Sequence, residues 1–105
     1  MNSRQKGARG ERELAKKLRE YGYECRRGQQ YSGVEGEDVI GLDGIHIECK
    51  RVERLQLTDA MLQSKRDTKD NKLPTVMHKK NNEDWMCTML LDDWIKLYND
   101  WHFHQ

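Results

Sequence analysis

Residues 37–50 contain two carboxylates and a lysine whose types and spacing suit a divalent metal site. Glu48 and Lys50 lie two positions apart, so in a β-strand they point to one side of a sheet together with His46. Asp38 lies in the preceding apolar run and reaches the same point if the two runs pair. Carboxylate oxygens suit Mg²⁺ or Mn²⁺, and a neighbouring lysine can hold or activate a water molecule. A plain surface hairpin with a Glu48–Lys50 ion pair is the alternative interpretation.

The two runs are predicted to form a β-hairpin. Residues 38–42 and 45–50 are separated by Asp43-Gly44, and glycine tolerates the positive φ that a two-residue turn requires. The opposite face of the second strand is apolar and is expected to join the core: Ile45, Ile47 and Cys49. The hairpin would therefore place Asp38 and Glu48 on neighbouring strands.

A third carboxylate comes from a predicted helix over residues 10–21, which Gly22 is expected to end. Its apolar residues recur at helical spacing: Leu14, Ala15, Leu18 and Tyr21. Glu11 lies one turn before this stripe and points with it toward the sheet, whereas Glu13 lies on the solvent face. An inward carboxylate needs a partner, and a metal or a neighbouring arginine would supply one. A glutamate at the rim, stabilised by the helix dipole, fits the pattern equally well.

The remaining segments alternate strand and helix patterns. They predict a strand over 23–27, a polar loop over 28–37, a helix from the N-cap Thr58 to about residue 69, strands over 73–79 and 85–90 with a turn at Asn81-Asn82, and a helix over 91–98. The inner face of the helix that begins after Thr58 comprises Leu57, Ala60, Met61 and Ser64, with Gln63 at its edge. The helix over residues 91–98 is expected to bury Leu91, Trp94, Ile95 and Tyr98. The order αβββαββα predicts an α/β fold in two or three layers.

Length and charge are compatible with a single domain that acts on a polyanion. The 105 residues predict one domain, 1–105, with one core and one sheet. The net charge is only +1, but residues 1–30 hold nine Lys/Arg against four acids, and residues 48–80 hold nine against five. Residues 31–47 between them carry four acids and no base. Two basic segments that bracket an acidic hairpin are typical of a metal site facing a polyanion.

Cysteine usage and hydropathy indicate where the protein is expected to reside. The three cysteines are far apart and form no CxxC pair, so free thiols in a reducing cytosol are expected. His102-x-His104 is compatible with adventitious metal binding or with a frayed tail. Because no apolar run reaches membrane length and the N-terminus has no signal-peptide pattern, we expect a cytoplasmic protein without a membrane partner.

With these residues placed, about residues 4–90 resemble the PD-(D/E)XK nuclease superfamily, and within it the small archaeal-type Holliday junction resolvases. The matching segments are residues 7–14 (GARGEREL), Gly22-Tyr23, Arg27, residues 37–40 (EDVI) and residues 47–50 (IECK). The three-residue E-x-K element alone is a weak signal, but a helical Glu, an Asp and E-x-K in this order and spacing are fairly specific. The chain departs from the pattern because Glu37 replaces the usual Pro and because the region after the fifth strand is short.

The resemblance implies a restriction-endonuclease-like αβββαβ(βα) core, with a mixed sheet flanked by helices, and a set of site residues. It implies that Asp38 and Glu48 bind a divalent metal, that Lys50 positions the attacking water, and that Glu11, not Glu13, is the helical acid of the metal site. Gln63 stands where many members carry a helical glutamine near the active site. The expected DNA-binding residues are Arg9, Arg12, Arg27, Ser32, Arg51 and Arg54.

The sequence therefore predicts an Mg²⁺-dependent endodeoxyribonuclease, with Mn²⁺ able to substitute, that cuts branched DNA in recombination or repair. A homodimer is expected because symmetric cleavage of a four-way junction needs two active sites, and one chain supplies one. Trp94, Trp101 and Phe103 crowd the C-terminal segment and could form a dimer surface or complete the monomer core. The alternatives are a repair or restriction-type nuclease on nicked or linear DNA, and a catalytically silent DNA-binding module of the same fold.

Overall fold

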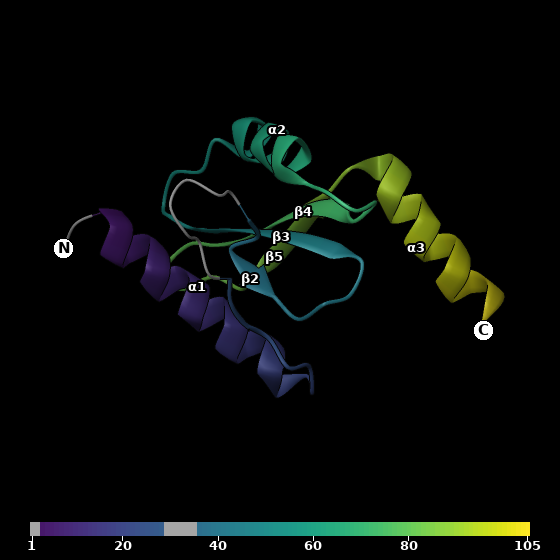
Figure 1. The fold of residues 1–105 in the computed structure, drawn as a ribbon, viewed down its shortest axis with the longest axis horizontal. Coiled ribbons are helices and arrows are strands. Elements are labelled where there is room, and N and C mark those ends of the chain that lie inside the picture. The colour runs from purple at the N-terminus through teal and green to yellow at the C-terminus, as the bar shows by residue number, and fades with distance from the viewer. Residues whose placement is uncertain (1–2, 29–35) are drawn as a thin grey trace.

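The structure is a computed structural model that describes residues 3–28 and 36–105. The elements follow in the predicted order: α1 (Ser3–Glu20), β1 (Arg26–Arg27), β2 (Val39–Ile40), β3 (Ile45–Arg51), α2 (Leu57–Asp67), β4 (Leu73–Lys79), β5 (Met86–Met89) and α3 (Leu91–Phe103) (Figure 1). The sheet has five strands in the order β1-β2-β3-β4-β5. Among the strands of the described residues only the β3–β4 pair is parallel, so the sheet is mixed. The predicted α/β fold with a mixed sheet flanked by helices is confirmed.

Helices α1 and α2 cover opposite faces of the sheet and give two hydrophobic clusters. On the α1 side, Leu14 and Ala15 pack on Val39 and Ile47. On the α2 side, Ala60 and Met61 pack on Val76 of β4. Strand β3 lies at the centre with one face toward each helix, which explains why His46 and Glu48 are buried although they are polar. The architecture is thus three-layered around β3.

The predicted hairpin between β2 and β3 is confirmed, with a shorter first strand. Val39 pairs with Ile47 in the antiparallel register, and the Ile45 N–H donates to the Leu42 carbonyl at 3.1 Å to close the turn. Gly44 has φ of +84°, the left-handed backbone that glycine adopts without strain. Strand β2 is limited to two residues because Gly41, with φ of +124°, departs from strand geometry.

Three predicted boundaries were wrong. Helix α1 begins at Ser3, not at residue 10, because its first turns are polar and leave no apolar period in the sequence. Strand β1 contains only Arg26–Arg27, and Tyr23, expected at its start, is exposed. Helix α2 has Gln56 as its N-cap, so Thr58 lies inside the helix, and Leu57 is exposed and not part of the inner face.

Helix α3 corrects the prediction most strongly. It extends to Phe103, and the side chains expected to be buried lie largely in solvent, with Leu91 72% and Trp94 48% exposed. Only Leu90 separates α3 from β5, so the helix leaves the end of the sheet and projects from the body (Figure 1). The amphipathic period identified its apolar side, but not whether the chain covers that side.

Candidate active site

Five predicted site residues meet in one open pocket of about 500 Å³ between α1, β2, β3 and α2. They are Glu11, Asp38, Glu48, Lys50 and Gln63. Lys6 of α1 and Arg51 of β3 also line the pocket and add positive charge at its edge. The structure therefore brings together residues as far apart in the sequence as Glu11 and Gln63, which are 52 positions apart.

Asp38 is fixed to the edge of β3 by main-chain contacts. Its N–H donates to the Ile47 carbonyl at 3.0 Å, and its Oδ2 accepts a hydrogen bond from the Cys49 N–H at 2.8 Å. The Gly28 N–H donates to the Asp38 carbonyl at 2.9 Å. A Cβ at Gly28 would lie 2.0 Å from the Glu37 carbonyl oxygen, so only glycine allows β1 to approach this segment so closely. The backbone thus sets the position of the Asp38 carboxylate before any ligand binds.

The carboxylates in the pocket repel one another in a poorly solvated environment. The pKa of Asp38 is raised from 3.8 to about 7, first by burial and then by the charge of Glu48. The hydrogen bond from the Cys49 N–H opposes this rise, while the charge of Glu11 adds to it. Glu48 itself is only 3% exposed. Negative charge held together out of water is what a bound cation would neutralise.

These donors fit Mg²⁺ in one particular coordination mode. Within residues 3–28 and 36–105, no group of three or more His, Cys, Asp and Glu side chains is arranged to hold a metal ion. Mg²⁺, however, is commonly bound through one or two carboxylates and completes its shell with water and substrate phosphate. Asp38 and Glu48 would therefore hold such an ion as a pair, whereas a fully protein-ligated metal cage does not fit the described residues.

Glu11 and Glu13 lie in different environments, as the helical period predicts. The Glu11 side chain faces the pocket, is 16% exposed and accepts a hydrogen bond from Arg27 Nε at 2.8 Å. Glu13 is more exposed and pairs with Arg51, whose Nε lies 3.0 Å from its Oε2. The sequence left either a metal or an arginine as the partner of Glu11, and the structure contains an arginine, Arg27. A role for Glu11 in metal binding stays a prediction.

Lys50 and Gln63 contact each other across the α2 side of the pocket. The Lys50 Nζ donates to the Gln63 Oε1 at 3.3 Å. Because β3 carries Glu48 and Lys50 on the same face, the ammonium group lines the same pocket as the carboxylate pair. The position suits a group that holds a water molecule or stabilises negative charge as it develops.

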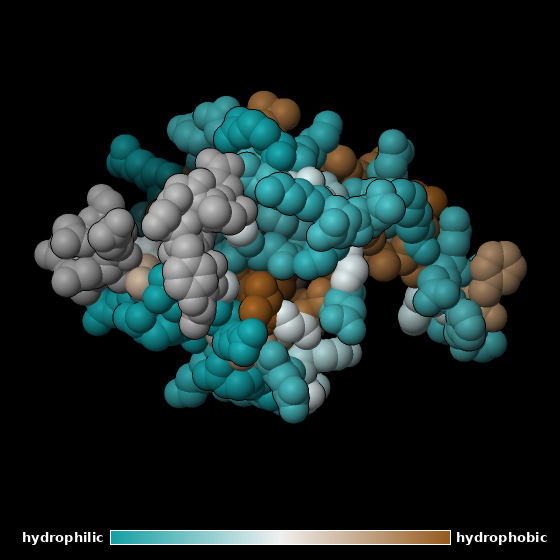
Figure 2. All heavy atoms as spheres, in the orientation of Figure 1, coloured by the Kyte–Doolittle hydropathy of each residue, from teal (hydrophilic) through white to brown (hydrophobic). Residues whose placement is uncertain are grey.

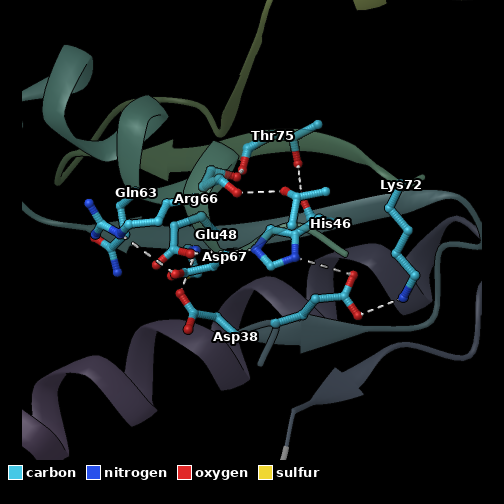
Figure 3. A network of polar contacts seen from close by, with 12 residues as sticks. Asp38, His46, Glu48, Gln63, Arg66, Asp67, Lys72 and Thr75 are labelled. Carbon is cyan, nitrogen blue, oxygen red and sulfur yellow. Dashed lines mark hydrogen bonds and ion pairs between the residues drawn. The ribbon is translucent and has the colours of Figure 1, made fainter. Parts of the chain in front are cut away.

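Sequence reasoning missed a second layer of polar residues behind Glu48. His46 is 2% exposed, and its Nε2 lies 3.8 Å from Glu48 Oε1 without a hydrogen-bond partner among the described residues (Figure 3). Its Nδ1 lies 4.0 Å from Glu37 Oε1, and Glu37 Oε2 lies 3.0 Å from Lys72 Nζ. The shared strand face of His46, Glu48 and Lys50 was the available signal. Lys72 carried no such signal in the sequence, because it comes close to Glu37 only when β4 pairs with β3 in the folded protein.

The predicted DNA-binding residues separate into three groups. Arg9 and Arg12 line a basic pocket of about 550 Å³ beside the active site, together with Lys6 and Lys16. Arg54 is exposed in the loop after β3. Arg27 and Arg51 form ion pairs with Glu11 and Glu13 respectively, and Arg51 also lines the basic pocket, so a role of both in DNA binding stays a prediction. Ser32 lies outside the described residues.

Gly10 explains how Arg51 comes so close to α1. A Cβ on Gly10 would lie 2.6 Å from the Arg51 Cβ, so glycine permits the helix to pack directly on the end of β3. Arg51 Nη2 also donates to Asn81 Oδ1 at 2.9 Å. These contacts tie Arg51 to the scaffold, although sequence reasoning grouped it with the phosphate contacts.

Comparison with known proteins bears on the fold. No protein-family model matches the sequence, and no curated protein matches it. A solved structure does: Hjc of Archaeoglobus fulgidus, a Holliday junction resolvase from an archaeal hyperthermophile, with a TM-score of 0.55 and 22% identity over 80% of this chain and 72% of that chain. The chain therefore has a fold similar to that of this resolvase. No helix in the described part of the chain is long and apolar enough to cross a membrane.

Proposed function

We propose that this protein is an Mg²⁺-dependent endonuclease that hydrolyses phosphodiester bonds in branched DNA. The observation that carries the proposal is the buried pair Asp38 and Glu48, held beside Lys50 in an open pocket. Basic side chains of α1 line a neighbouring pocket, which shares Lys6 with the first, and suit a phosphate backbone. The fold shared with a Holliday junction resolvase supports the choice of a branched substrate.

Each residue has a distinct part in this proposal. Asp38 and Glu48 would hold the cation, which when bound would act as a Lewis acid toward a phosphate oxygen and acidify a water molecule. Lys50 would keep the attacking water oriented toward phosphorus and stabilise the charge that develops in the transition state. Gln63 holds Lys50 in place through its amide oxygen. Arg9 and Arg12 would bind flanking phosphates without reading base sequence.

A homodimer is part of the proposal. Cutting two opposed strands of a four-way junction requires two active sites, and one chain contains a single pocket of this kind among its described residues. Two-fold symmetry would present the two sites to strands related by the same axis. A DNA substrate also implies an intracellular site of action.

Cleavage assays on a panel of DNA substrates of matched sequence test the function. We expect paired cuts in a four-way junction with Mg²⁺ or Mn²⁺, weaker cutting of flaps, and none in EDTA. Binding should weaken as salt is raised, because phosphate contacts release counterions. Equal cutting of nicked or linear duplex would instead favour a repair or restriction-type nuclease. Junction binding without cleavage under every metal condition would leave only the silent binding module.

A further inference from the structure

Helix α3 presents an apolar stripe that no other described element covers. Six exposed apolar residues share one side of the helix at helical spacing: Leu91, Trp94, Ile95, Leu97, Tyr98 and Trp101. Trp94 stacks on Tyr98 at 5.4 Å between ring centroids, and Tyr98 also contacts Trp101. Hydrophobic atoms gather along α3 in the space-filling view, whereas most of the visible surface is hydrophilic (Figure 2). An apolar face of this kind marks an interaction surface.

A second apolar surface that is only partly covered lies on the sheet face that α1 packs against, beside β4 and β5. Helix α1 has its main contacts with β1, β2 and β3, while on the same face Met77 of β4 and Trp85, just before β5, pack only in part against the core. The result is a groove of about 590 Å³ between the C-terminal half of α1 and β5. Its apolar lining includes Leu18, Tyr21, Met77, Trp85 and Cys87. In a three-layered fold a further helix on this face would bury these side chains.

The chain's own α3 is poorly placed to fill the groove. The groove lies beside the beginning of β5, at Trp85–Cys87, whereas α3 starts after the other end of that strand. Leu90 alone connects them, and the N–H groups of Asp93 and Trp94 both donate to the Leu90 carbonyl, which fixes the start of the helix. Figure 1 shows α3 running away from the sheet. A helix and a groove that cannot meet within one chain can meet between two.

We propose that two copies of this chain exchange their α3 helices, so that the apolar stripe of each α3 packs into the α1–β5 groove of the other copy. The exchange is symmetric and closed, because helix and groove are each contributed once by each copy. It also covers both unpartnered surfaces, whereas pairing α3 with α3 would leave the groove open. This inference rests on the homodimer of the proposed function, but not on its nuclease activity.

Size and charge favour a second copy over DNA as the occupant. Trp94, Tyr98 and Trp101 are 38–58% exposed, which represents on the order of 300 Å² of aromatic surface per helix. Two such helices in two grooves bring the interface toward the roughly 1,200–2,000 Å² of stable dimers. The polar side of α3 carries Asp92 and Asp100, which would repel phosphates. The groove rim carries both signs of charge and does not itself select an occupant: Lys16, Lys17 and Lys79 lie there with Glu13, Glu20, Glu83 and Asp84.

Cys87 provides a native probe of the proposed contact, because it lines the groove and is the exposed member of three free cysteines. We would measure sedimentation of the full chain at micromolar concentrations, together with iodoacetamide labelling resolved by peptide mass spectrometry. Buried Cys25 serves as the internal reference. We expect a dimer in which Cys87 labels at least about tenfold more slowly than in the dissociated monomer, since burial makes a thiol inert.

Two substitutions on α3 form a matched pair with the same change in charge. Trp101→Glu alters the apolar stripe and should weaken dimerisation about 30-fold or more, with Cys87 becoming reactive. Asn99→Glu alters the polar side of the same helix and should preserve both the dimer and the protection of Cys87. Circular dichroism verifies that each variant remains folded.

Three outcomes would overturn the proposal. A wild-type monomer, with and without four-way junction DNA, would exclude both the exchange and the homodimer of the proposed function, whereas metal-dependent cutting of single strands would still be decided by the cleavage assays. A dimer whose Cys87 labels as fast as in the monomer would place the interface elsewhere, for example between two α3 helices. Equal effects of Trp101→Glu and Asn99→Glu would show that the apolar stripe does not determine assembly.

Discussion

The active-site pocket and helix α3 depart from ordinary burial in opposite directions. In the pocket, ionisable groups are buried, and Glu48 is only 3% exposed. On α3, aromatic groups face solvent, and Trp101 is 58% exposed. A folded chain normally does the reverse, since charges lose solvation on burial and apolar surface gains from it. The comparison teaches that each departure matches one of the two proposals, a cation bound in the pocket and another apolar surface packed on α3.

The two regions also differ in how firmly the fold holds them. Glu48 lies on β3, in the centre of a sheet covered on both faces, and main-chain hydrogen bonds fix Asp38, which immediately precedes β2. Helix α3 is attached through Leu90 and packs little on the sheet. A catalytic site needs fixed geometry. A helix that packs on a second copy must instead extend away from its own sheet. The following experiments test this contrast, beginning with the largest expected effect.

Removing one pocket carboxylate should have the largest effect. Glu48→Gln keeps the size of the side chain but removes the charge that would bind the cation, so cleavage should fall by about 10³-fold or more. Asp38→Asn should lose activity similarly. Junction affinity, measured by fluorescence anisotropy in Ca²⁺, should change little, because phosphate contacts come from other residues.

Asp43→Asn is the matched control, because Asp43 is an exposed carboxylate in the turn of the same hairpin. Its activity should equal that of the wild type. Full activity of Glu48→Gln or Asp38→Asn with Mg²⁺ would disprove the metal assignment, and the burial of these carboxylates would then need a purely structural explanation.

The contrast also explains which features the sequence could predict. Strand β4 and the order of elements followed from apolar patterns, and the period of two correctly grouped His46, Glu48 and Lys50 on one face. The helical period correctly separated Glu11 from Glu13. The burial of α3 was wrong because periodicity orients a helix without saying what covers it. The Glu37–Lys72 contact was missed because it joins residues 35 positions apart through tertiary structure.

The two glutamates of α1 provide a smaller test within one helix. Glu11→Ala removes a carboxylate that faces the pocket and leaves Arg27 without its 2.8 Å partner, so we expect cleavage to fall about 10–100-fold. Glu13→Ala breaks an exposed ion pair with Arg51, and its effect should stay within about threefold. Single-turnover cleavage of a four-way junction measures both. A larger loss for Glu13→Ala would contradict the assignment of Glu11 to the site.

The smallest expected effect is a change in the free energy of unfolding with pH, measured without any cation in the pocket. The pKa of Asp38 is raised to about 7 in the folded protein by burial and by the charge of Glu48. Between about pH 4 and pH 7 the folded state therefore binds more protons at Asp38 than the unfolded state does. The free energy of unfolding should fall as the pH rises through this interval, and the stabilisation by the protonated carboxyl should be fully present only below it.

Asp38→Asn removes this titration while its amide oxygen can still accept the hydrogen bond from the Cys49 N–H. In EDTA at pH 8.5, urea denaturation should show the variant to be more stable than the wild type by about 2 kcal/mol, whereas near pH 4 the two should be alike. Mg²⁺ should then stabilise the wild type and not the variant, because a ligand that binds the folded state raises its stability. If Asp38→Asn is less stable than the wild type at pH 8.5, the carboxylate stabilises the metal-free fold, and its burial is not a feature that only a cation completes.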